Sequence, residues 1–155
     1  MTYRSGPVTE TDAVAIVPVL RQASRDELMA IGDEDFPATV MRLVAASSHD
    51  YCGADDAGPL FIGGASALWD EPDTAIVWML LTERVTQHRV FALREMRRQA
   101  VLMSGRWRVL RNCTEDRHQR TQAWLQWLGF TIGAPMPHPH TGRLVRPFER
   151  RVVHV

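Results

Sequence analysis

The chain has 155 residues, 45% of them hydrophobic and 23% charged, which is ordinary for one soluble globular domain with its own core. No apolar run approaches the ~20 residues that a membrane-spanning helix needs, and the N-terminus lacks the apolar segment of a secretory signal. Two cysteines, Cys52 and Cys113, are too few for a disulfide framework and have no metal-binding spacing, so we expect free thiols.

The charges cancel overall but are unevenly distributed. Residues 1–83 contain 4 arginines and 14 acidic residues, whereas residues 84–155 contain 14 arginines and 4 acidic residues. The chain has no lysine. One acidic and one basic surface would favour head-to-tail association or a phosphorylated partner. A fold that interleaves the two halves would instead cancel their fields.

The N-terminal third of the chain predicts three helices. Two of them have capping-box pairs, Thr9 with Asp12 and Ser24 with Glu27. Pro18 should kink or divide the first helix, and the second should stop near Gly32. The third opens with Pro37 in its first turn.

Three strands should follow. They are expected at 51–53, 60–68 and 75–81, with turns at 55–58 and 70–73. The pair Gly63 and Gly64 indicates either a bulge or a close backbone approach within the second of these strands. The last strand is continuously apolar, as buried strands are.

A long helix is expected over roughly 87–104, ended by Gly105, and a short strand at 107–110. Four residues form the predicted core stripe of this helix: Leu93, Met96, Ala100 and Met103.

The segment 116–132 organises the C-terminal half. Asp116 and Gln119 fit a capping box, and Gly129 stands where a left-handed residue is wanted after the helix. Four residues repeat at helical spacing on one face: Thr121, Trp124, Leu125 and Leu128. Strands should follow at 130–132 and 144–153, separated by a loop containing Pro135, Pro137 and Pro139. The element order predicts a single α/β (α+β) domain over residues 1–155, with a mixed, mostly antiparallel sheet flanked by helices.

The ordered motifs T-E-T-D, P-L-F-I-G-G-A-S, A-I-V-W-M-L-L-T and L-G-F resemble the GNAT superfamily of acyl-CoA-dependent N-acetyltransferases. With the closing G-R-L-V-R-P-F-E-R, the chain looks closer to one GNAT-like branch, the internal virion protein A family of short-tailed bacteriophages. This resemblance covers roughly residues 5–151.

The resemblance implies an acyl-CoA pyrophosphate site at the start of the long helix, where GNAT enzymes usually have a Q/R-x-x-G-x-G/A loop. Glycines let main-chain amides approach the phosphates, but this chain has none between Gly64 and Gly105. Glu83 adds negative charge there, which Arg84 and Arg89 could offset. The candidate cofactor-binding residues are Leu81, Thr82, Arg84, Arg89 and His118.

The resemblance also implies a tyrosine as general acid, but its position in this chain is Leu125. The asparagine often found early in the same helix is matched by His118. Candidate bases are carboxylates at strand ends, and the catalytic candidates are Glu71, Glu83 and His118. His138 and His140 lack a third ligand, so no metal site is expected.

Three functions are compatible with these features. The preferred one is a GNAT-fold phage protein with a degenerate acetyl-CoA site, needing no cofactor and acting through protein contacts as an internal virion or virion-assembly protein. It would associate with itself or with other virion proteins, in the virion and host cytoplasm. The alternative is an active acetyl-CoA-dependent N-acetyltransferase acting on a small amine or a host protein. The third, nucleic-acid binding through the arginines between Arg89 and Arg120, has no known motif. The core should hold Trp78, Trp107, Trp124 and Trp127, and an exposed cluster of them would indicate a protein interface.

Overall fold

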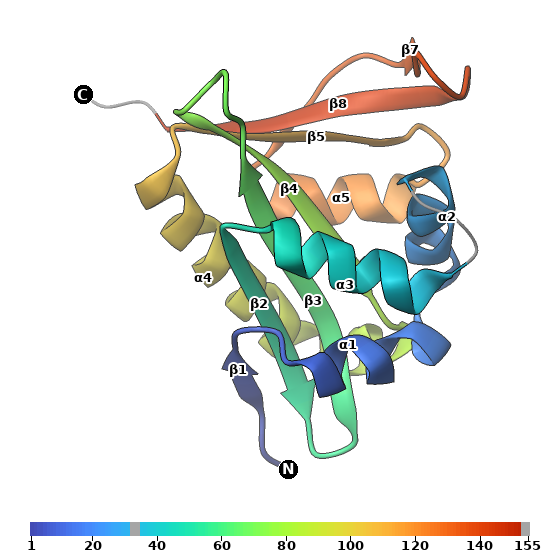
Figure 1. Ribbon diagram of the computed structural model, residues 1–155, viewed down its shortest axis with the longest axis vertical. Helices are drawn as coiled ribbons and strands as arrows, with labels where there is room; N and C mark the ends of the chain where they lie inside the picture. The colour runs from blue at the N-terminus through green and yellow to red at the C-terminus, as the bar shows by residue number, and fades with distance from the viewer. Residues whose placement is uncertain (32–34, 153–155) are drawn as a thin grey trace. The chain divides into compact units, whose positions relative to one another are not determined.

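The computed structural model describes residues 1–31 and 35–152 (Figure 1). In this part of the chain, no helix is long and apolar enough to cross a membrane. The chain divides into two compact units, residues 1–66 with 78–96 and residues 67–77 with 97–155. Two strands and one helix run through both units: β3 (Gly58–Ala67), β4 (Thr74–Leu81) and α4 (Arg89–Arg106).

The first unit also contains strands β1 (Arg4–Gly6) and β2 (His49–Asp55), which pair antiparallel, as β2 and β3 do. Its helices are α1 (Glu10–Ile16), the 3-10 turn η1 (Val17–Val19), α2 (Gln22–Ile31), α3 (Phe36–Ala46) and the 3-10 turn η2 (Glu83–His88). The capping box of Thr9 and Asp12 is present, Pro18 lies in η1, and Pro37 lies in the first turn of α3, as the sequence predicts.

Side chains alternate along β3, so the strand has an apolar residue for each face of the sheet. Ile62 joins a core with Ile16 of α1 and Val40 of α3, and Figure 1 shows α1 and α3 crossing in front of β2 and β3. The neighbouring Phe61 has its ring 6.1 Å from that of Phe91 on α4. Both faces of β3 are therefore buried, which explains its continuous apolar sequence.

The second unit contains β5 (Val109–Glu115), α5 (Gln119–Trp127), β6 (Thr131–Ile132), β7 (Met136–Pro137) and β8 (Leu144–Arg151). β4 and β5 are parallel, whereas β8 is antiparallel to β5, β6 and β7. The strand order is β1-β2-β3-β4-β5-β8-β6, with β7 also on β8. The predicted α/β class with a mixed, mostly antiparallel sheet is confirmed.

Two predicted helix starts are wrong. α2 begins at Gln22, so Ser24 is inside the helix, where it is buried and its hydroxyl accepts a hydrogen bond from the amide of Leu81 at 3.0 Å. α5 begins at Gln119 after His118, because the carboxylate of Asp116 is bonded to Arg146 instead of capping the helix. In both cases the side chain predicted to cap the helix is instead hydrogen-bonded to a residue distant in sequence.

The long helix begins at Arg89, after η2, and passes through Gly105 to Arg106, so the predicted bounds and stop are wrong. Trp107 explains the extension: it is 4% exposed, and its amide bonds to the carbonyl of Met103 at 2.9 Å. The following strand starts at Val109. In the proline loop, residues 136–137 form the short strand β7.

The glycines of β3 mark a close approach and no bulge. A Cβ on Gly64 would lie 2.7 Å from the carbonyl oxygen of His49 and 2.8 Å from the indole nitrogen of Trp78. The register shift of this hairpin occurs in β2 instead, between Gly53 and Ala54. Gly129 has φ of +93°, so the predicted left-handed residue after α5 is confirmed.

Candidate functional site

The segment that leaves β4 is the candidate phosphate-binding segment, and its first residues are fixed from within the first unit. Thr82 is fully buried, and both its amide (3.0 Å) and its hydroxyl (2.8 Å) donate to the carbonyl of Leu60. The predicted cofactor residue Thr82 therefore ties η2 to β3, and its hydroxyl is already used.

The main chain of Leu81 is also occupied. Its amide donates to the hydroxyl of Ser24, and its carbonyl accepts from the amide of Arg21 at 2.9 Å. The adjacent Leu20 forms a β-bridge with Thr82. A ligand could use the main chain of Leu81 only by displacing the segment that follows η1.

Arg84 is bound by a carboxylate of its own chain. Its guanidinium bonds to Asp55 at the end of β2, whose carboxylate also accepts from the amide of Ala57 at 3.0 Å. The Asp55 side chain is only 4% exposed. The hydrogen bond from Arg84 outweighs burial and holds the pKa of Asp55 below its ordinary value. Arg84 is therefore paired inside the protein.

The same carboxylate orients a histidine that the sequence did not single out. His88 Nε2 lies 3.2 Å from Asp55, and His88 Nδ1 lies 2.9 Å from the hydroxyl of Tyr3. The ring of Tyr3 stacks on Phe91 with centroids 4.1 Å apart. These four residues join the N-terminus, the β2–β3 hairpin and the start of α4, and no local motif indicates such distant pairs.

Few donors remain for a ligand in this segment. Val85 is buried, and its amide bonds to the carbonyl of Thr82 within the turn. The preceding amides of Glu83 and Arg84 have no acceptor within η2, as at any helix start. The guanidinium of Arg89 is exposed and unpaired within residues 1–31 and 35–152. Glu83 is exposed in the first turn.

In the second unit, His118 lies just before α5 beside a carboxylate. Its side chain is 10% exposed, and Nε2 is 3.8 Å from Oε2 of Glu115. Burial alone would raise the pKa of Glu115, but hydrogen bonds from Arg117 and Arg143 lower it by more. The pKa therefore lies below its ordinary value, and the carboxylate is ionised near neutral pH. This arrangement can hold an imidazole in one orientation. The sequence predicted His118 but missed Glu115.

β5 supplies two further polar groups that the sequence did not single out. The pairing of β4 with β5 runs from Thr74 to Ile76, and the next carbonyl, of Val77, accepts from the side-chain amide of Asn112 at 2.6 Å. The hydroxyl of Thr114 is buried and has no hydrogen-bond partner in the described part of the chain. Such an orphaned group is a candidate ligand contact.

The other positions singled out in the sequence are engaged in contacts within the protein. Glu71 is half-exposed and forms an ion pair with Arg111 at 2.9 Å. Leu125, in the place of the tyrosine, is 5% exposed and belongs to the core. His138 Nδ1 accepts hydrogen bonds from the amides of His140 and Thr141, which closes a turn. The described residues contain no group of three potential metal ligands.

Solved structures of acetyltransferases share this fold over nearly the whole chain. Ard1 from Thermoplasma volcanium has a TM-score of 0.73 at 10% identity, covering 99% of this chain and 100% of that one. A GNAT-family acetyltransferase from Streptococcus pneumoniae has a TM-score of 0.60 at 12% identity, with 98% and 100% coverage. The aminoglycoside acetyltransferase AAC(6')-Ib, solved with coenzyme A, has a TM-score of 0.66 at 12% identity, with 97% and 95% coverage.

By sequence, the chain matches no protein-family model and no curated protein. The likeness to the solved structures nevertheless shows that the fold is that of the GNAT acetyltransferases, as the motifs predicted. The Streptococcus pneumoniae protein and AAC(6')-Ib are acetyltransferases, and nothing in these comparisons supports the phage internal virion branch. The prediction that residues 1–155 form one domain stays a prediction.

Proposed function

We propose that this protein is an acetyl-CoA-dependent N-acetyltransferase with a weak hold on its acetyl donor. The observation that carries this proposal is the fold, which an aminoglycoside acetyltransferase solved with acetyl-CoA and paromomycin shares over 97% of this chain and 94% of that one. The hypothesis of an active acetyltransferase, the alternative in the sequence analysis, is better supported than the hypothesis of a non-catalytic virion protein.

The donors that remain at the start of η2 fit a phosphate group. They are the main-chain amides of Glu83 and Arg84 and the guanidinium of Arg89, a set that suits an anion at a helix start. The other predicted groups are committed, because Thr82 bonds to Leu60 and Arg84 bonds to Asp55. The Glu83 carboxylate opposes the charge of a phosphate. We therefore expect weaker binding than a glycine-rich loop would support.

Acetyl-CoA supplies an acetyl group activated as a thioester. Transfer forms a C–N bond to the amine and breaks the C–S bond, so the amine loses one proton and the departing sulfur gains one. Leu125 cannot donate a proton. His118 is held beside the ionised carboxylate of Glu115. Among the side chains of the second unit, it is the best arranged to accept the proton of the amine.

Two measurements test the proposal. Calorimetric titration with acetyl-CoA should show binding in the range of about 0.1–1 mM, and mass spectrometry should show acetylation of an aminoglycoside, a polyamine or a peptide amine. His118→Gln should reduce kcat and change its pH profile, whereas His140→Gln, an exposed histidine in the β7–β8 turn, should not. Absence of both binding and product would overturn the proposal.

The second candidate is the non-catalytic protein predicted from the sequence, acting through protein contacts. Its support is specific: position 125 is a core leucine and Arg84 is paired with Asp55. The proposed virion partners and virion localisation belong to this candidate and rest on the sequence resemblance. It predicts no heat of binding with acetyl-CoA and a stable complex with another protein, which co-purification from infected cells would detect.

A further inference from the structure

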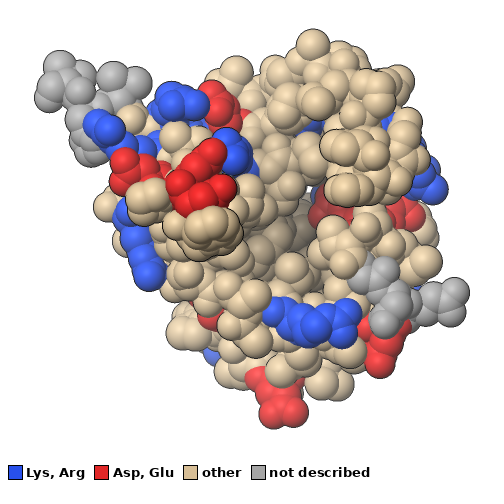
Figure 2. Space-filling view, turned by 45° about the horizontal axis from the view of Figure 1, so that its top comes forward, with Lys and Arg blue, Asp and Glu red and all other residues tan. Residues whose placement is uncertain are grey.

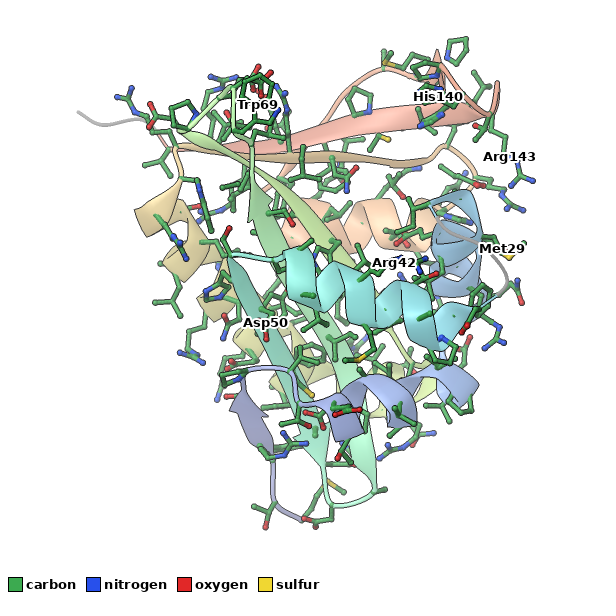
Figure 3. All side chains as sticks on the ribbon, in the orientation of Figure 1. Met29, Arg42, Asp50, Trp69, His140 and Arg143 are labelled. Atoms are coloured by element: carbon green, nitrogen blue, oxygen red, sulfur yellow. The ribbon has the colours of Figure 1, made fainter. Side chains whose placement is uncertain are left out.

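The loop that joins β3 to β4 presents an aromatic side chain to solvent. Trp69 is 94% exposed, and Figure 3 shows it at the outer end of this loop. The loop is nevertheless ordered, because Leu68 bonds to the carbonyl of Thr74 (3.1 Å) and Thr74 to that of Glu71 (2.9 Å). A fully exposed indole on a defined turn contributes nothing to the core, and indoles are enriched at protein interfaces.

Two carboxylates beside this indole have no counter-ion among the residues that the structure describes. Glu71 is paired with Arg111, but Asp70 and Asp73 form no ion pair within the described residues. We call residues 69–73 the acidic loop. On the face shown in Figure 2, acidic and arginine side chains lie side by side at the upper left. The loop thus combines an apolar ring with uncompensated negative charge.

The same unit also contains a patch of the opposite character. The guanidinium of Arg97 on α4 lies 5.2 Å from the ring centre of Trp127, which is 46% exposed at the end of α5. One turn further along α4, Val101 is 55% exposed on the same side of the helix. Arg97, Val101, Trp127 and Arg150 form what we call the arginine–tryptophan patch.

Arg150 of β8 is fixed in this patch by hydrogen bonds to the hydroxyl of Ser104 and, at 3.4 Å, to the carbonyl of Ala100. Its Nε passes so near Gly129 that a Cβ there would lie 3.1 Å away. No carboxylate pairs with Arg97 or Arg150 in the described part of the chain. Burial and the charge of Arg97 lower the pKa of Arg150. Two guanidinium groups are therefore held together without an anion between them.

The acidic loop leads into β4, and Arg150 of the patch lies on β8; β5 is hydrogen-bonded between these two strands. The amide of Val109 on β5 bonds to the carbonyl of Asp73 at 3.0 Å, and the next residue, Leu110, pairs with Arg150. A two-fold axis near this end of β5 would bring each loop onto the patch of the other copy. Such an isologous interface contains the same contact twice.

We propose that the acidic loop of one copy docks on the arginine–tryptophan patch of a second copy, forming a two-fold homodimer. The Trp69 ring covers Val101 and Trp127, while the carboxylates of Asp70 and Asp73 meet Arg97 and Arg150. The charges of loop and patch are complementary, and within the described residues Asp70, Asp73, Arg97 and Arg150 form no ion pair. This proposal is independent of the acetyltransferase activity proposed above.

Light scattering on the full chain tests the salt dependence. At ~0.1 M salt and a protein concentration of about 100 µM we expect a mass of twice 17.6 kDa, falling toward the monomer at ~1 M salt, where the Debye length is only ~3 Å. A monomer at low salt would overturn the proposal. A dimer that salt does not weaken would also overturn it, since its interface would be another, apolar surface.

A charge exchange tests which surfaces meet. Arg97→Glu alone, or Asp70→Arg alone, should give monomers, and mixing the two variants should restore the dimer, because one contact is then the wild-type one and in the other the arginine introduced at position 70 faces the glutamate introduced at position 97 while Asp73 still faces Arg150. Arg94→Glu, an exposed change of equal charge on α4, should leave the wild-type dimer intact. Failure of the mixture to associate, or binding of inorganic phosphate by a wild-type monomer at Arg97 and Arg150, would replace this dimer with a small-anion site.

Discussion

The carboxylate of Asp55 is bonded to the guanidinium of Arg84, so a cation at the start of η2 is neutralised by the β2–β3 hairpin. A carboxylate so placed competes with any anionic ligand for the same guanidinium. The low acetyl-CoA affinity that we propose therefore has a definite structural cause besides the missing glycines.

Asp55→Asn should release Arg84 and strengthen acetyl-CoA binding about three- to tenfold, or ~0.7–1.4 kcal/mol, because a charged hydrogen bond to phosphate becomes available. Calorimetry measures the change. Asp56→Asn is the matched control, because Asp56 is exposed and, among the described residues, its carboxylate accepts only from the amide of Thr2. An unchanged affinity would show that Arg84 cannot reach the phosphates.

The buried carboxylate of Asp12 should make the protein sensitive to acid. Burial raises the pKa of Asp12, but bonds from Arg4, at 2.6 and 3.3 Å, and from Thr9 hold it below the ordinary 3.8. A carboxyl whose pKa is lower in the folded state stabilises that state above the unfolded pKa. This contribution disappears as the pH falls through the folded pKa. Urea unfolding should therefore show a loss of stability below about pH 4.

In Asp12→Asn the loss below pH 4 should be smaller, and the free energy of unfolding at pH 7 should fall by about 1–2 kcal/mol, as when a helix cap is removed. Glu10→Gln is the control, because Glu10 is exposed in the same helical turn. An acid profile that Asp12→Asn does not alter would assign the loss to other carboxyls such as Glu115.

Leu125→Asp should unfold the protein or lower its stability by more than the ~2–5 kcal/mol typical of a buried leucine changed to alanine. Leu125 is 5% exposed, whereas its neighbour Gln126 is exposed, so Gln126→Asp is the control for charge in α5. Thermal unfolding monitored by circular dichroism compares the two. Equal melting temperatures would contradict the burial of position 125.

Gly64→Ala should destabilise the fold by ~1–3 kcal/mol, because its methyl group would meet the backbone of His49 and the indole of Trp78. Gly6→Ala has no atom within 4 Å of the new methyl group and should change stability little. Denaturant titration of both variants gives the difference. A neutral Gly64→Ala would mean that β2 and β4 can move apart there at little cost.

Local sequence patterns were enough to predict most of the elements. The apolar residues of α5 recur at helical spacing, and β4 is a short continuous apolar run. The first pattern is typical of a helix with one buried face and the second of a buried strand, so both elements were predicted. Helix ends were less predictable. Ser24 and Asp116 are good capping residues, but Leu81 and Arg146 use their oxygens, and sequence spacing does not reveal these partners.

The candidate site shows the same division. The sequence by itself determined that the chain has no glycine-rich phosphate loop and no tyrosine at position 125, because these are properties of residue type. Only the tertiary structure decided that Arg84 is paired with Asp55, that His118 lies beside Glu115, and that Trp69 is exposed. Any of the 18 arginines could have met a given carboxylate, and the pairing of β2 with β3 together with the anchoring of Thr82 on Leu60 brought Arg84 to Asp55. Side-chain chemistry is local, whereas the choice of partner depends on how distant strands pair.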